Sequence, residues 1–137
     1  MNNKLKVQIN SFSYKREIPK DISGNGGGFV FDCRAIHNPG RYDKYKDLTG
    51  KDKDVIDFLD NEQEMQEFLK DVFSIIDKSV KKYLQRKFTN LMVNFGCTGG
   101  QHRSVYAAER LSKYLKDNYN ITIKTKHIEQ EIINNIK

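Results

Sequence analysis

The 137-residue sequence is long enough for one hydrophobic core and short for two, so we expect a single domain over residues 1–137. Its 37% hydrophobic and 31% charged residues exclude a disordered tail, and no apolar run approaches the roughly 18 to 20 residues of a membrane span. The net charge of +6 favours anionic partners such as nucleic acid or phosphorylated metabolites, although solubility explains it equally well.

Two cysteines are too few for a disulfide framework, and the chain is expected in the cytoplasm with both as thiols and with no membrane partner. The core of such a polar chain is modest, so a homo-oligomer would supplement it. These expectations leave local chemistry as the role of the cysteines.

The first third of the chain predicts two strands and an irregular loop. Apolar residues alternate with polar ones over 5–9, which is typical of a strand with one buried face. A glycine-rich breaker at 24–28 precedes the apolar run 29–31, which we interpret as a buried second strand. Residues 35–50 then read as an irregular, charged loop.

The remainder alternates helices and strands. Helical spacing predicts a short helix over 55–59 and a long one over 65–84, capped by Asp60 or Asn61. The apolar run 91–95 predicts a strand covered on both faces. The further elements are a helix from about 105 to 117–118, a strand over 121–125 and a terminal helix from about 128. The order contains two strand-helix-strand crossovers and predicts an α/β domain with a mixed or parallel sheet flanked by helices.

The loop between the 91–95 strand and the next helix has the parts of a phosphate-binding site. Two glycines allow successive main-chain amides to converge on one anion, and the helix start adds free N–H groups and a positive dipole end. An arginine adds a planar fork that fits phosphate. A tight structural turn is the alternative interpretation. The candidate ligand-binding residues are Cys97, Thr98, Gly99, Gly100, Gln101, His102, Arg103 and Ser104.

A second polar loop follows the 29–31 strand. Loops at the carboxyl ends of parallel strands share one rim, so Arg34, Asn38 and Arg41 are expected near the first loop. A structural pair between Asp32 and Arg34 is the alternative. Neither the 97–104 loop nor the glycine cluster at 24–28 has the Walker pattern Gly-x-x-x-x-Gly-Lys. The candidate zinc ligands are Cys33, His37, Cys97 and His102. No Cys-x-x-Cys or His-x-x-x-His spacing supports a zinc site, so we predict no metal and no cofactor.

An enzyme is the rival hypothesis. Cys97 and Arg103 have the Cys-x5-Arg spacing of cysteine-dependent phosphatases, in which a thiolate attacks phosphorus. Cys97 would be the nucleophile, and the general acid would come from Asp32, Asp43 or Asp47. The histidine common before the phosphatase cysteine is replaced by Gly96. A phosphate site also exists without turnover, so binding is favoured over catalysis.

Three blocks of the sequence resemble the carboxyl-terminal domain of RapZ, the bacterial RNase adapter family, over a core of about residues 5–127. They are Phe31-Asp32-Cys33-Arg34 with Asn38-Pro39, then Leu48-Thr49-Gly50 with Phe58-Leu59-Asp60, and the long signature from Gly96 to Val105. The resemblance implies a noncatalytic domain that senses an amino-sugar phosphate, glucosamine 6-phosphate, and binds small regulatory RNA as an oligomer.

The resemblance also assigns residues and marks departures. It implies that Cys97, Thr98, Gly99, His102 and Arg103 line the sugar-phosphate pocket, with Arg34 and Asn38 nearby. Many members have His where this chain has Gly40, and their basic run after the last strand is replaced by 129–133, which is acidic and apolar. Full-length members also carry a Walker-type nucleotide-binding domain that this sequence lacks, so ATP or GTP binding is not expected here.

Overall fold

Four parallel strands form one sheet in the computed structural model, which describes residues 4–136. The strands are β1 (Lys6–Ser13), β2 (Phe29–Asp32), β3 (Asn90–Cys97) and β4 (Thr122–His127). Their order across the sheet is β2-β3-β1-β4, and each neighbouring pair is parallel. The predicted α/β class is confirmed, and the sheet is wholly parallel.

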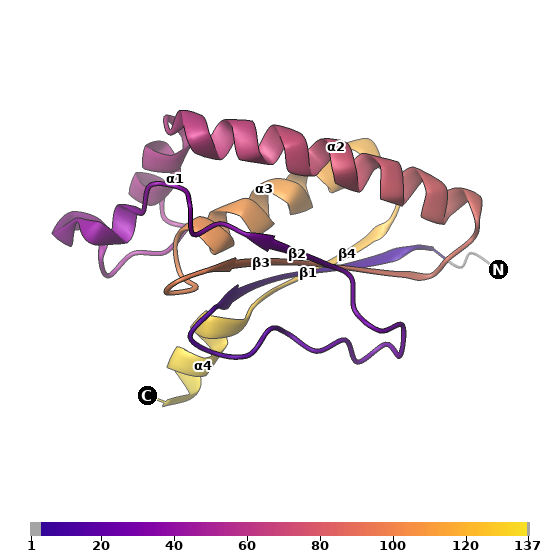
Figure 1. Ribbon diagram of the computed structural model, residues 1–137, viewed down its shortest axis with the longest axis horizontal. Helices are drawn as coiled ribbons and strands as arrows, with labels where there is room; N and C mark the ends of the chain where they lie inside the picture. The colour runs from indigo at the N-terminus through magenta and orange to yellow at the C-terminus, as the bar shows by residue number, and fades with distance from the viewer. Residues whose placement is uncertain (1–3, 137) are drawn as a thin grey trace.

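Three α-helices cover one face of this sheet (Figure 1). They are α1 (Lys53–Asp60), α2 (Gln63–Gln85) and α3 (Arg103–Asn118), and α4 (Ile128–Ile136) lies on the opposite side. Both predicted crossovers are present, because α1 and α2 connect β2 to β3 and α3 connects β3 to β4. The hydrophobic core fills the space under α1–α3; it includes Val7, Ile9, Leu69, Val72, Val93, Phe95, Ala108 and Leu111.

Two local predictions are wrong. β2 is an edge strand whose side chains alternate between half-buried and exposed, and Val30 is 42% exposed, so the strand is not buried. The short apolar run does not reveal that only one neighbouring strand, β3, pairs with it. The long helix α2 starts after Glu62, which makes no side-chain capping bond, because Asp60 and Asn61 still belong to the end of α1 and its cap.

The other face of the sheet carries polar side chains; α4 covers one end of it, and a loop covers most of the rest. We call it the loop-covered face; it includes Lys6, Gln8, Asn10, Asn94, Lys124 and Lys126, and the chain over 14–28 passes beneath it (Figure 1). The amide of Asn10 donates to Asn94 at 2.9 Å, and Asn94 donates to the Phe29 carbonyl at 3.0 Å. Over residues 4–136 no helix is both long and apolar enough to cross a membrane.

Candidate phosphate-binding site

The glycine loop joins the end of β3 to the start of α3 at the carboxyl edge of the sheet. Thr98 and Gly99 are exposed, whereas Gly100 is buried with a φ of +70°. A β-carbon on Gly100 would lie 2.8 Å from the amide nitrogen of Ser13. Glycine is therefore required at this position by both backbone angle and space.

The main-chain amides of this loop are unpaired. Within residues 4–136, none of the amides of 98–102 donates a hydrogen bond to a protein acceptor. They directly precede α3, whose first turn lacks a side-chain cap and contains no acidic residue. Free amides and the positive end of a sixteen-residue helix together favour an anion at this edge.

Arg103 connects the two predicted loops. Its side chain is buried, with 3% of the residue exposed, and its Nη1 atom donates to the carbonyls of Arg34 and Ile36 at 2.8 Å each and of Cys33 at 3.3 Å. In the described part of the chain, the buried Nε atom has no hydrogen-bond partner. The guanidinium therefore holds the 33–36 segment through neutral carbonyls and keeps one donor unused.

The second loop is fixed mainly by its own contacts. Arg34 forms a bidentate pair with Asp32, with Nη2 to Oδ2 at 2.8 Å, and its guanidinium lies 3.7 Å from the Tyr14 ring centre. Arg34 is therefore paired with Asp32, as in the second of the two interpretations given for this residue. The hydrogen bonds from Arg34 lower the pKa of Asp32. Asn38 accepts from the amide of Gly40 at 2.9 Å, and Arg41 is exposed.

Gly40 brings the second loop to the first. A β-carbon there would lie 3.2 Å from Cε1 and Nδ1 of His102, while the Nε2 of His102 bonds the carbonyl of Tyr45 at 2.9 Å. The amide of Gly50 donates to the Gln101 carbonyl at 2.8 Å. The 38–50 segment therefore packs against the start of α3 through Gly40, Tyr45 and Gly50, whereas a ligand contact from Asn38 stays a prediction.

Cys97 faces the core. It is 2% exposed, and its Sγ lies 3.1 Å from Oγ of Ser104, itself fully buried. Burial raises the pKa of the neighbouring Cys33 thiol well above its ordinary value. These positions suit packing better than nucleophilic attack. Over residues 4–136 no group of three or more His, Cys, Asp or Glu side chains is arranged to hold a metal ion.

Comparison with known proteins decides the family. The model of the RapZ C-terminal domain matches residues 5–131. The chain belongs to the RapZ C-terminal domain family. It is 36% identical over 126 residues to a "Nucleotide-binding protein" of Thermosipho melanesiensis and 34% identical over 130 residues to "Nucleotide-binding protein XCV3122" of Xanthomonas euvesicatoria pv. vesicatoria. These alignments cover 92% and 95% of this chain and 44% of each relative, so it spans less than half of their length.

Two further contacts in this RapZ-family chain are not predicted by its sequence. Arg16 forms a bidentate pair with Glu129 at 2.6 and 3.0 Å, which ties α4 to the segment after β1. A β-carbon added to Gly100 would lie 2.9 Å from the β-carbon of Glu129. The Arg16–Glu129 pair therefore packs α4 against the glycine loop. No local pattern marks the pair, because 113 positions separate its members. The second contact is that of Gly50 with the start of α3, where its amide donates to the Gln101 carbonyl, and no local pattern predicts it.

Proposed function

We propose that this domain binds a phosphorylated metabolite in the 97–104 loop, with an amino-sugar phosphate such as glucosamine 6-phosphate as the ligand. The unpaired amides of 98–102 at the start of α3 carry this proposal. A phosphate group accepts several hydrogen bonds at once, so it matches a cluster of donors that have no protein acceptor. The role is binding and sensing within a regulatory protein.

Arg103 supports the same proposal. Arg103 is the first residue of α3 and directly follows the loop amides, and its hydrogen bonds go to neutral carbonyls, so no carboxylate partner within residues 4–136 neutralises its positive charge beside the proposed phosphate. His102 and the turn at Gly40 border the loop and would meet the sugar. Nucleotide binding, which the relatives' names state, is not proposed for this chain because the Walker pattern is missing from these 137 residues.

A titration followed by amide NMR tests the proposal. Glucosamine 6-phosphate is expected to shift the amide signals of Thr98–Ser104, and glucosamine without phosphate is not. Arg103→Lys keeps the charge but loses the planar fork, and should weaken binding by about tenfold. Signals from the loop that stay unchanged at millimolar glucosamine 6-phosphate would contradict the assignment.

RNA binding by an oligomer is the second candidate function, and the net charge of +6 favours it. The acidic residues of α4 oppose RNA at the carboxyl end, although Glu129 is already neutralised by Arg16. Retention of structured RNA should fall steeply between 50 and 200 mM salt, roughly 10-fold or more, because counterions are released on binding. Affinity that is independent of salt would exclude this mode, and light scattering would give the oligomeric state.

A further inference from the structure

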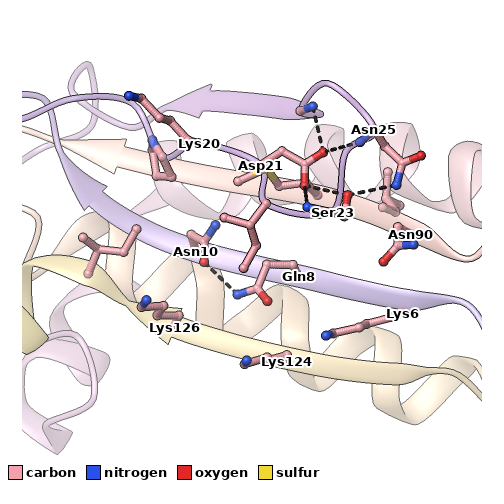
Figure 2. A pocket seen from close by; sticks show the side chains of 16 residues that line it. Lys6, Gln8, Asn10, Lys20, Asp21, Ser23, Asn25, Asn90, Lys124 and Lys126 are labelled. Carbon is pink, nitrogen blue, oxygen red and sulfur yellow. Dashed lines mark hydrogen bonds between the residues drawn. The ribbon is translucent and has the colours of Figure 1, made fainter.

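The loop-covered face contains a cavity of about 320 Å³ that is separate from the 97–104 loop. None of the loop's eight residues lines it. The cavity lies between the polar side chains of β1 and β4 and the chain over 19–27 (Figure 2). Its volume falls within the range of small-molecule sites, roughly 300 to 1,000 Å³.

Lysines dominate the charge of this cavity. Figure 2 shows Lys6, Lys124 and Lys126 along one side, with Lys20 across from them. In the described residues, Lys6 and Lys124 have no ion-pair partner, while Lys126 is 3.9 Å from Glu131 and both of these side chains are half exposed. Exposed ion pairs of this kind are weak, so the residues that line the cavity keep a net positive charge.

The one carboxylate that lines the cavity is occupied by its own loop. Asp21 accepts from the amides of Ser23 at 2.8 Å, Gly27 at 3.0 Å and Asn25 at 3.2 Å. A β-carbon on Gly28 would lie 2.1 Å from the Met92 carbonyl, so the loop returns to β2 directly against β3. The loop that forms the rim of the cavity is therefore held in place. The carboxylate of Asp21 is used in hydrogen bonds within this loop.

The cavity floor is preorganised by amides. Gln8 donates to Asn10 at 2.8 Å, and Asn10 is held in turn by Asn94, with both asparagines nearly fully buried. Strand register places Lys124 beside Gln8 and Lys126 beside Asn10. Two same-face positions on one strand are roughly 6.6 Å apart, so these ammonium groups suit a ligand with more than one anionic group.

We propose that this cavity binds a small metabolite carrying two or more phosphate groups, with Lys6, Lys124 and Lys126 as the cationic contacts and Gln8 as a hydrogen-bonding contact. Charge complementarity selects the anion, and the volume of about 320 Å³ suits a small molecule. Single-stranded RNA fits less well, because no aromatic side chain among the lining residues offers a base a stacking surface.

Inorganic tripolyphosphate is the probe for the test, with orthophosphate as the single-anion control. Tripolyphosphate should shift the amide signals of Gln8, Asn25 and Lys124 and bind more tightly than orthophosphate. The variant Lys6→Ala/Lys124→Ala should weaken binding about tenfold, because two ammonium contacts are lost. The matched control Lys81→Ala/Lys116→Ala removes equal charge from exposed positions of α2 and α3 and should change affinity less than twofold.

Several results would overturn the proposal. They are an equal loss of affinity in both double variants, shifts confined to other residues, binding of citrate but not tripolyphosphate, and lysine-dependent binding of RNA with no response to tripolyphosphate. The glucosamine 6-phosphate response of Thr98–Ser104 should persist in Lys6→Ala/Lys124→Ala. Failure of one site is therefore distinguishable from failure of the other.

Discussion

Gly40 lies against His102, because a β-carbon on Gly40 would stand 3.2 Å from the Nδ1 atom of the imidazole. The ring is also held from the other side by the bond between its Nε2 and the Tyr45 carbonyl. The turn after Asn38 is therefore the part of the second loop that borders the glycine loop most directly. A side chain introduced at Gly40 would change the border of the proposed sugar site.

Gly40→His restores the residue that many family members have at this place. The added imidazole supplies one more hydrogen-bonding group beside His102, so affinity for glucosamine 6-phosphate should rise by about threefold to tenfold. Isothermal titration calorimetry measures this, with Gly40→Ala as the matched control for the added β-carbon. Equal affinities in the two variants would show that the imidazole does not reach the ligand.

Arg103→Ala should destabilise the fold as well as the site. The Nη1 atom bonds three main-chain carbonyls of the 33–36 segment, and its loss leaves buried acceptors unpaired. We expect the free energy of unfolding in urea to fall by about 2–4 kcal/mol. Arg103→Lys should recover part of the lost free energy of unfolding. A stability equal to that of the wild type in Arg103→Ala would mean that water replaces the guanidinium without cost.

Gly50→Ala tests how the 42–50 loop supports the start of α3. A β-carbon on Gly50 would lie 2.4 Å from the His102 carbonyl and 2.5 Å from the Tyr106 amide nitrogen, so one of the two segments must move. The free energy of unfolding should fall by about 1–3 kcal/mol, with weaker phosphate binding. Gly99→Ala is the matched control for stability, because no atom lies within 4 Å of its added β-carbon.

The rim of the loop-covered face should respond to acid. Hydrogen bonds from Ser23 and the loop amides lower the pKa of Asp21 from 3.8 to about 2. A lowered folded-state pKa stabilises the loop above pH 3.8, and this contribution is lost as the pH falls toward 2. The amide signals of Ser23 and Gly27 should therefore titrate with a midpoint near 2 and stay flat in Asp21→Asn. A midpoint near 3.8 would mean that these bonds do not persist in solution.

The sequence predicts the second half of the fold well, because periodicity is a local property. The run at 91–95 becomes β3, buried on both faces, and the predicted helix end at 117–118 agrees with the end of α3 at Asn118. The predicted last strand and terminal helix correspond to β4 and α4. Strand order is not local, so the apolar run 29–31 predicts a buried strand although β2 lies at the edge of the sheet.

The candidate site was only partly predictable for the same reason. Residue types identify the glycine loop and the arginine, and the shared rim of parallel strands predicts that the loop after β2 approaches it; Gly40 of that loop lies against His102. The carbonyl partners of Arg103 lie about seventy positions away, so no spacing could show that the arginine also holds the 33–36 segment. The pairing of β4 with β1 is not local either, and only the strand register places Lys124 beside Gln8.

Cys97 decides between binding and catalysis. The residue is 2% exposed, and its thiol contacts Ser104. Asp32, one of the three candidate general acids, is paired with Arg34. We therefore expect no hydrolysis of p-nitrophenyl phosphate above the buffer rate, and Cys97→Ser should bind glucosamine 6-phosphate within about twofold of the wild type, a change of about 0.4 kcal/mol. Turnover by the wild type that disappears in Cys97→Ser would instead establish the phosphatase, since a buried thiol could react only if the glycine loop opened to admit the substrate.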